Sequence, residues 1–223
     1  ATIDERLRMQ MMGASITALS QGIPFFHAGV DMLRSKSMDA DSYNSGDHFN
    51  RLDWSYEMNN FGVGLPPAEK NRDRWSIMAP ILAREDITPG KDEIVAMHAH
   101  VRAMLEVRKS SPLFRLRSAD DVMARVEFHN TGRDQTPGVI AMSVSDAVDG
   151  LPDLDPKHEH VVVVFNATKE SQTVADGGWK DAGFELHPRL AACDDRVAES
   201  SYDAGGGAFM VPARTTAVFV AGE

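Results

Sequence analysis

The apolar positions at the start of the chain recur with the spacing of a helix. Four of them fall on one helical face: Ile3, Leu7, Met11 and Ala14. Thr2 and Glu5 have the spacing of a capping box, which satisfies free N–H groups at a helix N-terminus. Asp4 and Glu5 also suit the positive end of the helix dipole. The pattern predicts that the chain opens with a helix.

Two short apolar runs, residues 16–19 and 23–26, flank Ser20-Gln21-Gly22. The second run is closed by Gly29, and its length and boundaries are typical of a buried strand. We therefore expect a strand over residues 23–26.

Residues 30 to about 90 are rich in Asp, Asn, Ser, Gly and Pro. A stretch this long without regular structure is usually functional or disordered. Aromatic residues recur through it, which disfavours disorder: Tyr43, Phe49, Trp54, Tyr56, Phe61 and Trp75. We expect an ordered functional loop that contains short helices.

A second helix is predicted over residues 91–109. Its apolar stripe consists of Ile94, Met97, Val101, Met104 and Leu105. Ser110-Ser111-Pro112 should end it, because the residue before a proline disfavours the helical conformation. The stripe indicates a core-facing helix rather than a cofactor site.

After about residue 118 the apolar pattern changes to short runs separated by Gly, Pro, Asp and Asn, with no strong helix between them. This is typical of an antiparallel sandwich. The predicted strands are residues 122–128, 138–144, 161–166, 171–174, 184–187, 208–211 and 215–220.

Charge and composition exclude several classes of protein. The net charge of −10 comes without a cluster of Lys and Arg, which argues against nucleic acid as a partner. No apolar run reaches the ~18 residues of a membrane helix, so we expect no membrane partner. Cys193 is the only cysteine, so an intrachain disulfide is impossible. No His pair has convincing metal-ligand spacing.

Several sequence blocks resemble the pullulanases and plant limit dextrinases of the α-amylase superfamily. They are Gln21 to Gly29, Leu33 to Ser37, Asp41 to Asp47, Phe49 to Asp53, Asn59 to Pro66, Ser110 to Phe114 and Val126 to Gly132. The spacing between the blocks is similar too, and the resemblance covers most of the chain.

The resemblance implies a fold of the α/β plus all-β kind. Residues 1–117 would be the C-terminal segment of a (β/α)8 TIM barrel: a helix, strand eight, its long loop and the last helix. Residues 118–223 would be an antiparallel β-sandwich domain. Because one or two strands cannot close a barrel, the missing N-terminal portion of the same enzyme is an expected partner. The opening without an initiator Met agrees with this.

The same resemblance implies cleavage of α-1,6-glucosidic branch linkages in pullulan, amylopectin or limit dextrins, with retention of configuration. Retaining hydrolysis needs two carboxyl groups about 5 Å apart. In this superfamily they come from barrel strands that would precede Ala1, so we assign no catalytic residue and expect the chain alone to be inactive. Asp47 and Asp53, six positions apart in the loop, are not favoured as a substitute pair.

Binding of a branched α-glucan is the expected role of the long loop. Aromatic faces suit the C–H surfaces of sugars, and carboxylates, amides and Arg suit their hydroxyl groups. The candidate substrate-binding residues are Asp47, Asn50, Arg51, Asp53, Asn59, Asn60 and Phe61. An ordinary structural role in the loop remains the alternative for each. No cofactor or metal is assigned, although structural calcium would suit the parent enzyme.

The sequence also departs from the family pattern. Val30-Asp31 stands where relatives often have Asp-Glu, and His48 and Phe61 stand where a Trp is common. Two alternatives to the hydrolase fragment stay open: a carbohydrate-binding or structural module, and one half of a two-chain barrel. The sequence leaves the compartment and the preferred glucan open.

Overall fold

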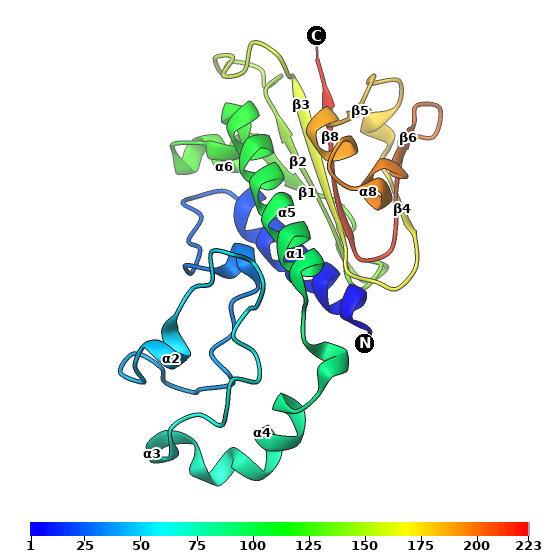
Figure 1. Ribbon diagram of the computed structural model, residues 1–223. Coiled ribbons are helices and arrows are strands. Elements are labelled where there is room, and N and C mark those ends of the chain that lie inside the picture. The colour runs from blue at the N-terminus through cyan, green and yellow to red at the C-terminus, as the bar shows by residue number, and fades with distance from the viewer. Residues whose placement is uncertain (223) are drawn as a thin grey trace. The chain divides into compact units, whose positions relative to one another are not determined.

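The computed structural model describes residues 1–222 and divides the chain into two compact units (Figure 1). The first unit contains residues 1–10 and 26–99, and the second contains residues 11–25 and 100–222. Both long helices, α1 (Ile3–Leu19) and α5 (Lys91–Ser110), run through a boundary between the units. None of the described helices is both long and apolar enough to cross a membrane.

Helix α1 begins with the predicted capping box. The backbone N–H of Thr2 donates to Glu5 Oε2 at 2.9 Å, and that of Glu5 donates to Thr2 Oγ1 at 3.2 Å. These bonds satisfy two of the free N–H groups at the start of the helix. Its buried residues cluster in the C-terminal half: Met11, Met12, Ala14, Ser15, Ala18 and Leu19.

The strand predicted over residues 23–26 is wrong: that segment has no regular secondary structure. It is also not buried as expected, since the side chains of Ile23 and Phe25 are 90% and 92% exposed. An extended segment becomes a strand only when a neighbour pairs with its backbone. Among residues 1–222, no strand pairs with this one.

The long loop of the first unit contains short helices, as predicted. They are η1 (Val30–Met32), α2 (Asp47–Asn50), α3 (Ala68–Asn71), η2 (Arg72–Arg74), α4 (Trp75–Leu82) and η3 (Glu85–Ile87). Some of its aromatic side chains are buried and others exposed: Phe49 is 9% exposed, whereas Tyr43 is 80% and Trp54 is 70% exposed. One of the exposed rings also has a partner in the unit, because Lys70 Nζ lies 4.5 Å from the ring centroid of Tyr43.

Helix α5 has almost the predicted bounds, and its C-terminal half binds the end of α1 within the second unit. The guanidinium of Arg108 donates to the carbonyl oxygens of Ala18, Ser20 and Gly22 at 2.6–2.9 Å. These carbonyls at the end of α1 lack partners within their own helix. After α5, Pro112 begins the short helix η4 (Pro112–Arg115), which Ser111 caps.

The predicted strand over residues 122–128 is wrong in its first half. The structure has helix α6 (Ala119–Arg125), followed by the short strand β1 (Val126–Phe128). Ser118 caps the helix, because its Oγ accepts from the backbone N–H of Asp121 at 3.0 Å. This local cap outweighs the β-branched residue inside the segment.

The remaining strands form two antiparallel sheets, as the sequence pattern predicts. The five-stranded sheet has the order β1-β2-β3-β8-β5, and the three-stranded sheet has the order β4-β7-β6. Their bounds are β2 Val139–Ser145, β3 His160–Asn166, β4 Gln172–Ala175, β5 Glu185–Leu186, β6 Ser201–Asp203, β7 Ala208–Val211 and β8 Thr215–Ala221. The sequence pattern did not predict β6, the turn η5 (Gly177–Trp179) or the one-turn helices α7 (Pro188–Ala191) and α8 (Asp195–Ala198).

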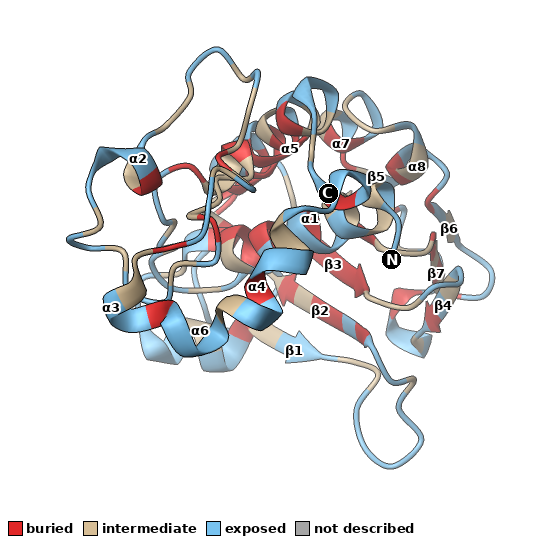
Figure 2. Ribbon diagram, turned by 60° about the horizontal axis from the view of Figure 1, so that its bottom comes forward, coloured by how far each residue is buried: buried red, intermediate tan, exposed pale blue. Residues whose placement is uncertain are grey.

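The core of the second unit lies between the two sheets, around Phe209. Its ring centroid lies 4.5–5.1 Å from those of Trp179, Phe184, Tyr202 and Phe219. Figure 2 shows that β3 is almost wholly buried, whereas β1 is mostly exposed. The apolar packing therefore weakens toward the β1 edge of the larger sheet.

A buried ion pair joins α6 to the end of β2. Arg125 is 2% exposed and Asp146 is 4% exposed, and Arg125 Nη1 lies 2.6 Å from Asp146 Oδ1. Asp146 Oδ2 accepts from the backbone N–H groups of Leu154 and Asp155 at 2.8 and 2.7 Å. The pair thus also holds the loop that follows β2.

Replacing Arg125 with Ala should lower the free energy of unfolding by about 3–5 kcal/mol, because the carboxylate of Asp146 would stay buried without its cation. Urea denaturation followed by circular dichroism measures the change. Arg133→Ala, at an exposed arginine, is the matched control and should change stability by less than ~0.5 kcal/mol. Equal losses in both variants would contradict the importance of the pair.

His187 is a buried histidine that caps helix α7. Its Nδ1 accepts from the backbone N–H of Arg189 at 3.2 Å, and its Nε2 lies 3.1 Å from Ser110 Oγ. Burial lowers the pKa of His187, because the charged imidazolium would lose its hydration. The folded state therefore favours the neutral ring.

The depressed pKa of His187 predicts a loss of stability in acid. As the pH falls below about 6.5, the unfolded chain takes up a proton on this side chain before the folded chain does. His187→Asn keeps a capping acceptor and removes the titration. Thermal unfolding at a series of pH values should show a shallower acid decline for the variant than for the parent chain. Parallel declines would contradict the assignment.

Candidate functional site

All seven candidate substrate-binding residues lie in the first unit, between α2 and the segment before α3. Helix α2 contains the first two. Asp47 is exposed at its first position, and within residues 1–222 its carboxylate has no hydrogen-bond partner. Asn50, at its last position, donates from Nδ2 to the carbonyl oxygens of Ser42 and Gly46 at 2.6 and 3.1 Å. Asp47 is thus available to a ligand, whereas the amide donor of Asn50 closes the loop.

Arg51 and Asp53 follow α2 but do not pair directly. Both carboxylate oxygens of Asp53 accept hydrogen bonds. Oδ1 accepts from the backbone N–H of Ser55 at 3.1 Å and from its hydroxyl at 2.6 Å. Oδ2 accepts from the backbone N–H of Met58 at 3.0 Å. The hydrogen bond from the Ser55 hydroxyl, and those from the backbone, hold the pKa of Asp53 below its usual value. The exposed guanidinium of Arg51 contacts the sulfur of Met58.

Asn59 and Asn60 hold the turn before Phe61. Asn59 Nδ2 donates to Leu33 O at 2.8 Å, and its Oδ1 accepts from Phe61 N at 3.1 Å. Asn60 is only 4% exposed, and its Nδ2 donates to His48 O at 3.0 Å. Its φ of 71° lies in the left-handed region, which Asn tolerates better than most residues. Both amides therefore make structural contacts in the first unit.

Two cavities of the first unit collect five of the seven residues. The larger, of about 400 Å3, is lined by Asn59 and Phe61, with apolar side chains from α1 and the loop and the polar groups of Arg6, Arg34 and Glu93. The smaller, of about 10 Å3, holds no more than a single water and is lined by Arg51, Asp53, Asn59 and Asn60. Asp47 and Asn50 line neither.

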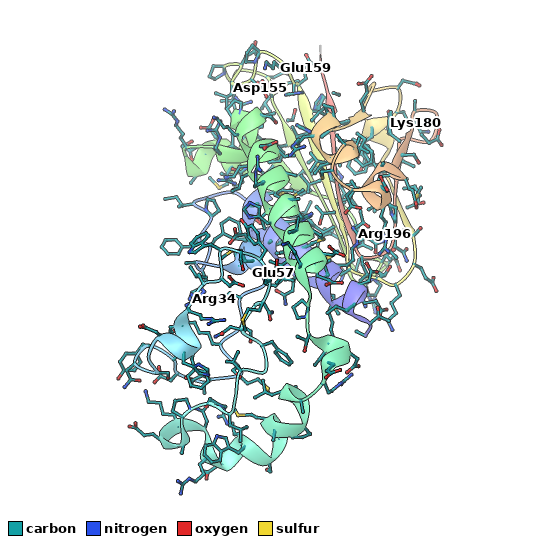
Figure 3. All side chains as sticks on the ribbon, in the orientation of Figure 1. Arg34, Glu57, Asp155, Glu159, Lys180 and Arg196 are labelled. Atoms are coloured by element: carbon teal, nitrogen blue, oxygen red, sulfur yellow. The ribbon has the colours of Figure 1, made fainter. Side chains whose placement is uncertain are left out.

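Arg34, labelled in Figure 3, lines both cavities, although it was not among the predicted residues. Its guanidinium donates to Ala28 O at 3.1 Å and also to Asn50 O. The only sequence signal was its place in the block from Leu33 to Ser37. Arg34 links the start of the long loop to helix α2.

A second contact that the sequence did not reveal joins Asp31 to the middle of α5. His98 Nδ1 lies 2.9 Å from Asp31 Oδ2, and the His98 ring centroid lies 5.5 Å from that of Tyr56. Asp31 occupies one of the positions at which the sequence departs from the pattern of the family that it resembles. Its carboxylate therefore anchors the loop to α5 within the first unit.

The residues combine exposed charged groups with one aromatic ring in a cavity wall. Asp47 and Arg51 present opposite charges at the surface, and the ring of Phe61 forms part of a cavity wall. Among residues 1–222, no three His, Cys, Asp or Glu side chains are placed to hold a metal ion. Asp47 and Asp53 are also in unlike surroundings, because only Asp53 is fully hydrogen-bonded to its own loop.

Comparisons with known proteins all lead to one family. The family model described as "Alpha-1,6-glucosidases, pullulanase-type, C-terminal" matches residues 56–222. The chain is 48% identical over 223 residues to "Pullulanase 1, chloroplastic" of Arabidopsis thaliana, covering 98% of this chain and 23% of that protein. It is 36% identical over 219 residues to the pullulanase of Klebsiella pneumoniae, covering 98% of this chain and 20% of that protein.

Solved structures agree with these sequence matches. The maltotriose complex of PulA from Klebsiella pneumoniae superposes with a TM-score of 0.92 at 36% identity, over 100% of this chain and 24% of that one. The mixed helices and antiparallel sheets described above therefore match the fold of that protein region. The chain spans about a fifth to a quarter of the length of these relatives.

Proposed function

Since this chain belongs to the pullulanase-type α-1,6-glucosidases, we propose that it is the C-terminal region of a starch-debranching glycoside hydrolase. The 48% identity to an Arabidopsis thaliana pullulanase over 98% of the chain carries this proposal. The partial coverage of every such relative supports a parent protein that is several times longer.

Residues 1–117 would then complete a (β/α)8 barrel, with residues 118–223 as the β-sandwich domain that follows it. The state of residues 23–26 supports this arrangement. Ile23 and Phe25 project almost fully into solvent, at 90% and 92% exposure, and the segment has no strand partner among residues 1–222. Burying two such apolar side chains against barrel neighbours would contribute several kcal/mol at about 25 cal/mol per Å2.

The proposed reaction is hydrolysis of α-1,6-glucosidic linkages in pullulan, amylopectin or limit dextrins with retention of configuration. Its two carboxyl groups, about 5 Å apart, would come from the N-terminal portion of the parent enzyme. This chain would supply part of the glucan-binding surface through its long loop. The maltotriose complex of the Klebsiella pneumoniae relative supports a glucan as the ligand.

Within that loop, some of the seven candidate residues would contact the glucan directly, and the others would mainly hold the loop in shape. Asp47, Arg51 and Phe61 would contact the glucan directly, because their carboxylate, guanidinium and ring are not committed to the loop backbone. Asn50, Asp53, Asn59 and Asn60 would hold the loop in shape and offer their remaining polar atoms to sugar hydroxyl groups.

The purified 223-residue chain should release no maltotriose from pullulan, because it lacks the two reacting carboxyl groups. Chromatography of the digest measures release, and the complete parent enzyme serves as the positive control. Release that a substitution within residues 1–223 abolishes would reject the proposal that catalysis resides elsewhere.

In the complete parent enzyme, Phe61→Ala should raise KM for branched dextrins about tenfold and change kcat much less. The lost ring contact is expected to bind substrate and transition state equally. Phe128→Ala, which removes a half-exposed ring from β1, is the matched control and should leave KM unchanged. A large fall in kcat alone, or unchanged kinetics in a well-folded Phe61→Ala enzyme, would contradict the binding role.

A further inference from the structure

The second unit contains a cavity of about 230 Å3 at the β1–β2 side of its core. None of its lining residues belongs to the long loop of the first unit. Side chains from β1, β2 and β3 form one wall, and the turn η5 forms another. Glycine at position 207 lets this turn approach β7, since a Cβ there would lie 2.5 Å from Asp176 O. The position of η5, which forms one wall of the cavity, therefore depends on this close backbone approach.

Strand register explains why the cavity is polar on one side. Glu127 lies opposite Ser143, Ser143 opposite Val162, and Val162 opposite Phe219. Directly opposite residues share one face of a sheet. The inward-facing row thus changes from apolar on β8 and β3 to polar on β2 and β1. Because the smaller sheet packs through β7 on β3 and β8, it leaves the polar end of the row uncovered.

A chain of hydrogen bonds fixes the groups at the back of the cavity. His129 Nδ1 lies 2.9 Å from Asp176 Oδ2, and His129 Nε2 lies 2.8 Å from Ser143 Oγ. A carboxylate only accepts hydrogen bonds, so Nδ1 of His129 carries a proton, and in the neutral ring Nε2 accepts from the Ser143 hydroxyl. The Ser143 oxygen keeps its lone pairs for a ligand's O–H group.

Three other polar groups of the lining have no protein partner among residues 1–222: the indole N–H of Trp179, the imidazole nitrogens of His160 and the carboxylate of Glu127. Trp179 is only 6% exposed, but its indole N–H still reaches solvent, because it is not among the fully buried polar atoms that lack a partner. The lining therefore presents one unpaired donor, one acceptor and one group that can do either.

The order Asp176–His129–Ser143 resembles a hydrolytic triad, but the surroundings of Ser143 do not suit nucleophilic catalysis. Ser143 lies in the middle strand of three, between β1 and β3, where the backbone is part of the sheet ladder. Acyl transfer needs backbone N–H groups aimed at a developing oxyanion, and a ladder commits them elsewhere. The chain of bonds thus positions Ser143 for binding.

We propose that this cavity binds one glucosyl residue of an α-glucan, as a second glucan site on the β-sandwich. The hydroxyl groups would pair with Trp179, Glu127 and Ser143, and one ring face would lie on the apolar wall at Val162 and Phe184. The absence of Lys and Arg from the described lining disfavours an anion. The volume lies below the usual ~300–1,000 Å3 of drug-sized sites and suits one ring rather than a chain.

Indole N–H resonances of the 15N-labelled chain test this site during titration with maltotriose. Trp179, assigned by Trp179→Phe, should shift. Trp75 should not, because its Nε1 already donates to Pro66 O at 2.9 Å. Trp54, exposed in the long loop, reports separately on binding there. A shift at Trp54 with none at Trp179, at millimolar sugar, would overturn the second site and leave the proposed loop function intact.

Variants then test the chemistry of the site. Glu127→Gln should weaken the maltotriose-dependent shift of Trp179 about fivefold, as expected for one impaired hydrogen bond. Glu185→Gln, at an exposed glutamate on β5, is the matched control. Sorbitol has the hydroxyl groups without the ring and should not shift Trp179. Equal effects of both glutamate variants, or equal shifts by sorbitol, would overturn the proposal.

Discussion

The need to pair the backbone of every strand decides which parts of this chain become sheet. β8 pairs with β3 on one side and with β5 on the other, and the seven paired positions from His160↔Ala221 to Asn166↔Thr215 fix the register of β3 and β8. That register places Val162, Val164, Ala217 and Phe219 together in the core. Residues 23–26 are similarly apolar, but no described strand offers them a partner, and they stay irregular.

This constraint also explains how far the fold could be predicted from the sequence. The capping box of α1 and the apolar stripe of α5 are local, and the sequence located both helices correctly. Six of the eight predicted strands exist at nearly the expected positions, because their apolar runs are short and bounded by turn residues. A seventh, predicted over residues 122–128, forms only over Val126–Phe128. The strand over residues 23–26 failed because its stability depends on neighbours that a single sequence pattern does not reveal.

Smaller errors have local physical causes. The Ser118 cap turned residues 119–125 into a helix, because Ser at the N-cap followed by Asp120 and Asp121 favours a helix start. The three-residue strand β6 was missed because only Tyr202 in it is substantially apolar. Its ring nevertheless stacks on Phe209 at 5.1 Å, a tertiary contact that gives the strand its place.

For the candidate site, which stays a prediction, the structure changes the roles that residue type suggested for individual side chains. From residue type alone, Asn59 and Asn60 were as good candidates for sugar contacts as Phe61. In the structure, however, the side-chain amides of both residues donate to loop carbonyl oxygens. Arg34 and the Asp31–His98 contact were missed because their partners lie 16 and 67 positions away in sequence. In a long loop, many backbone N–H and C=O groups have no partner in a helix or sheet, so polar side chains form hydrogen bonds with them instead.

The polar side chains of the loop and of the sandwich face different demands from the backbone around them. In the loop, most polar side chains bond to the backbone, whereas the carboxylate of Asp47 has no partner among residues 1–222 and the guanidinium of Arg51 contacts only the sulfur of Met58. In the sandwich, the ladder already satisfies the backbone, so polar side chains on the inner face need another partner. His129, Ser143 and Asp176 satisfy one another, but the indole N–H of Trp179 does not share in that network. A donor that no protein acceptor uses, beside the unpaired groups of His160 and Glu127, is what a bound hydroxyl group would complete.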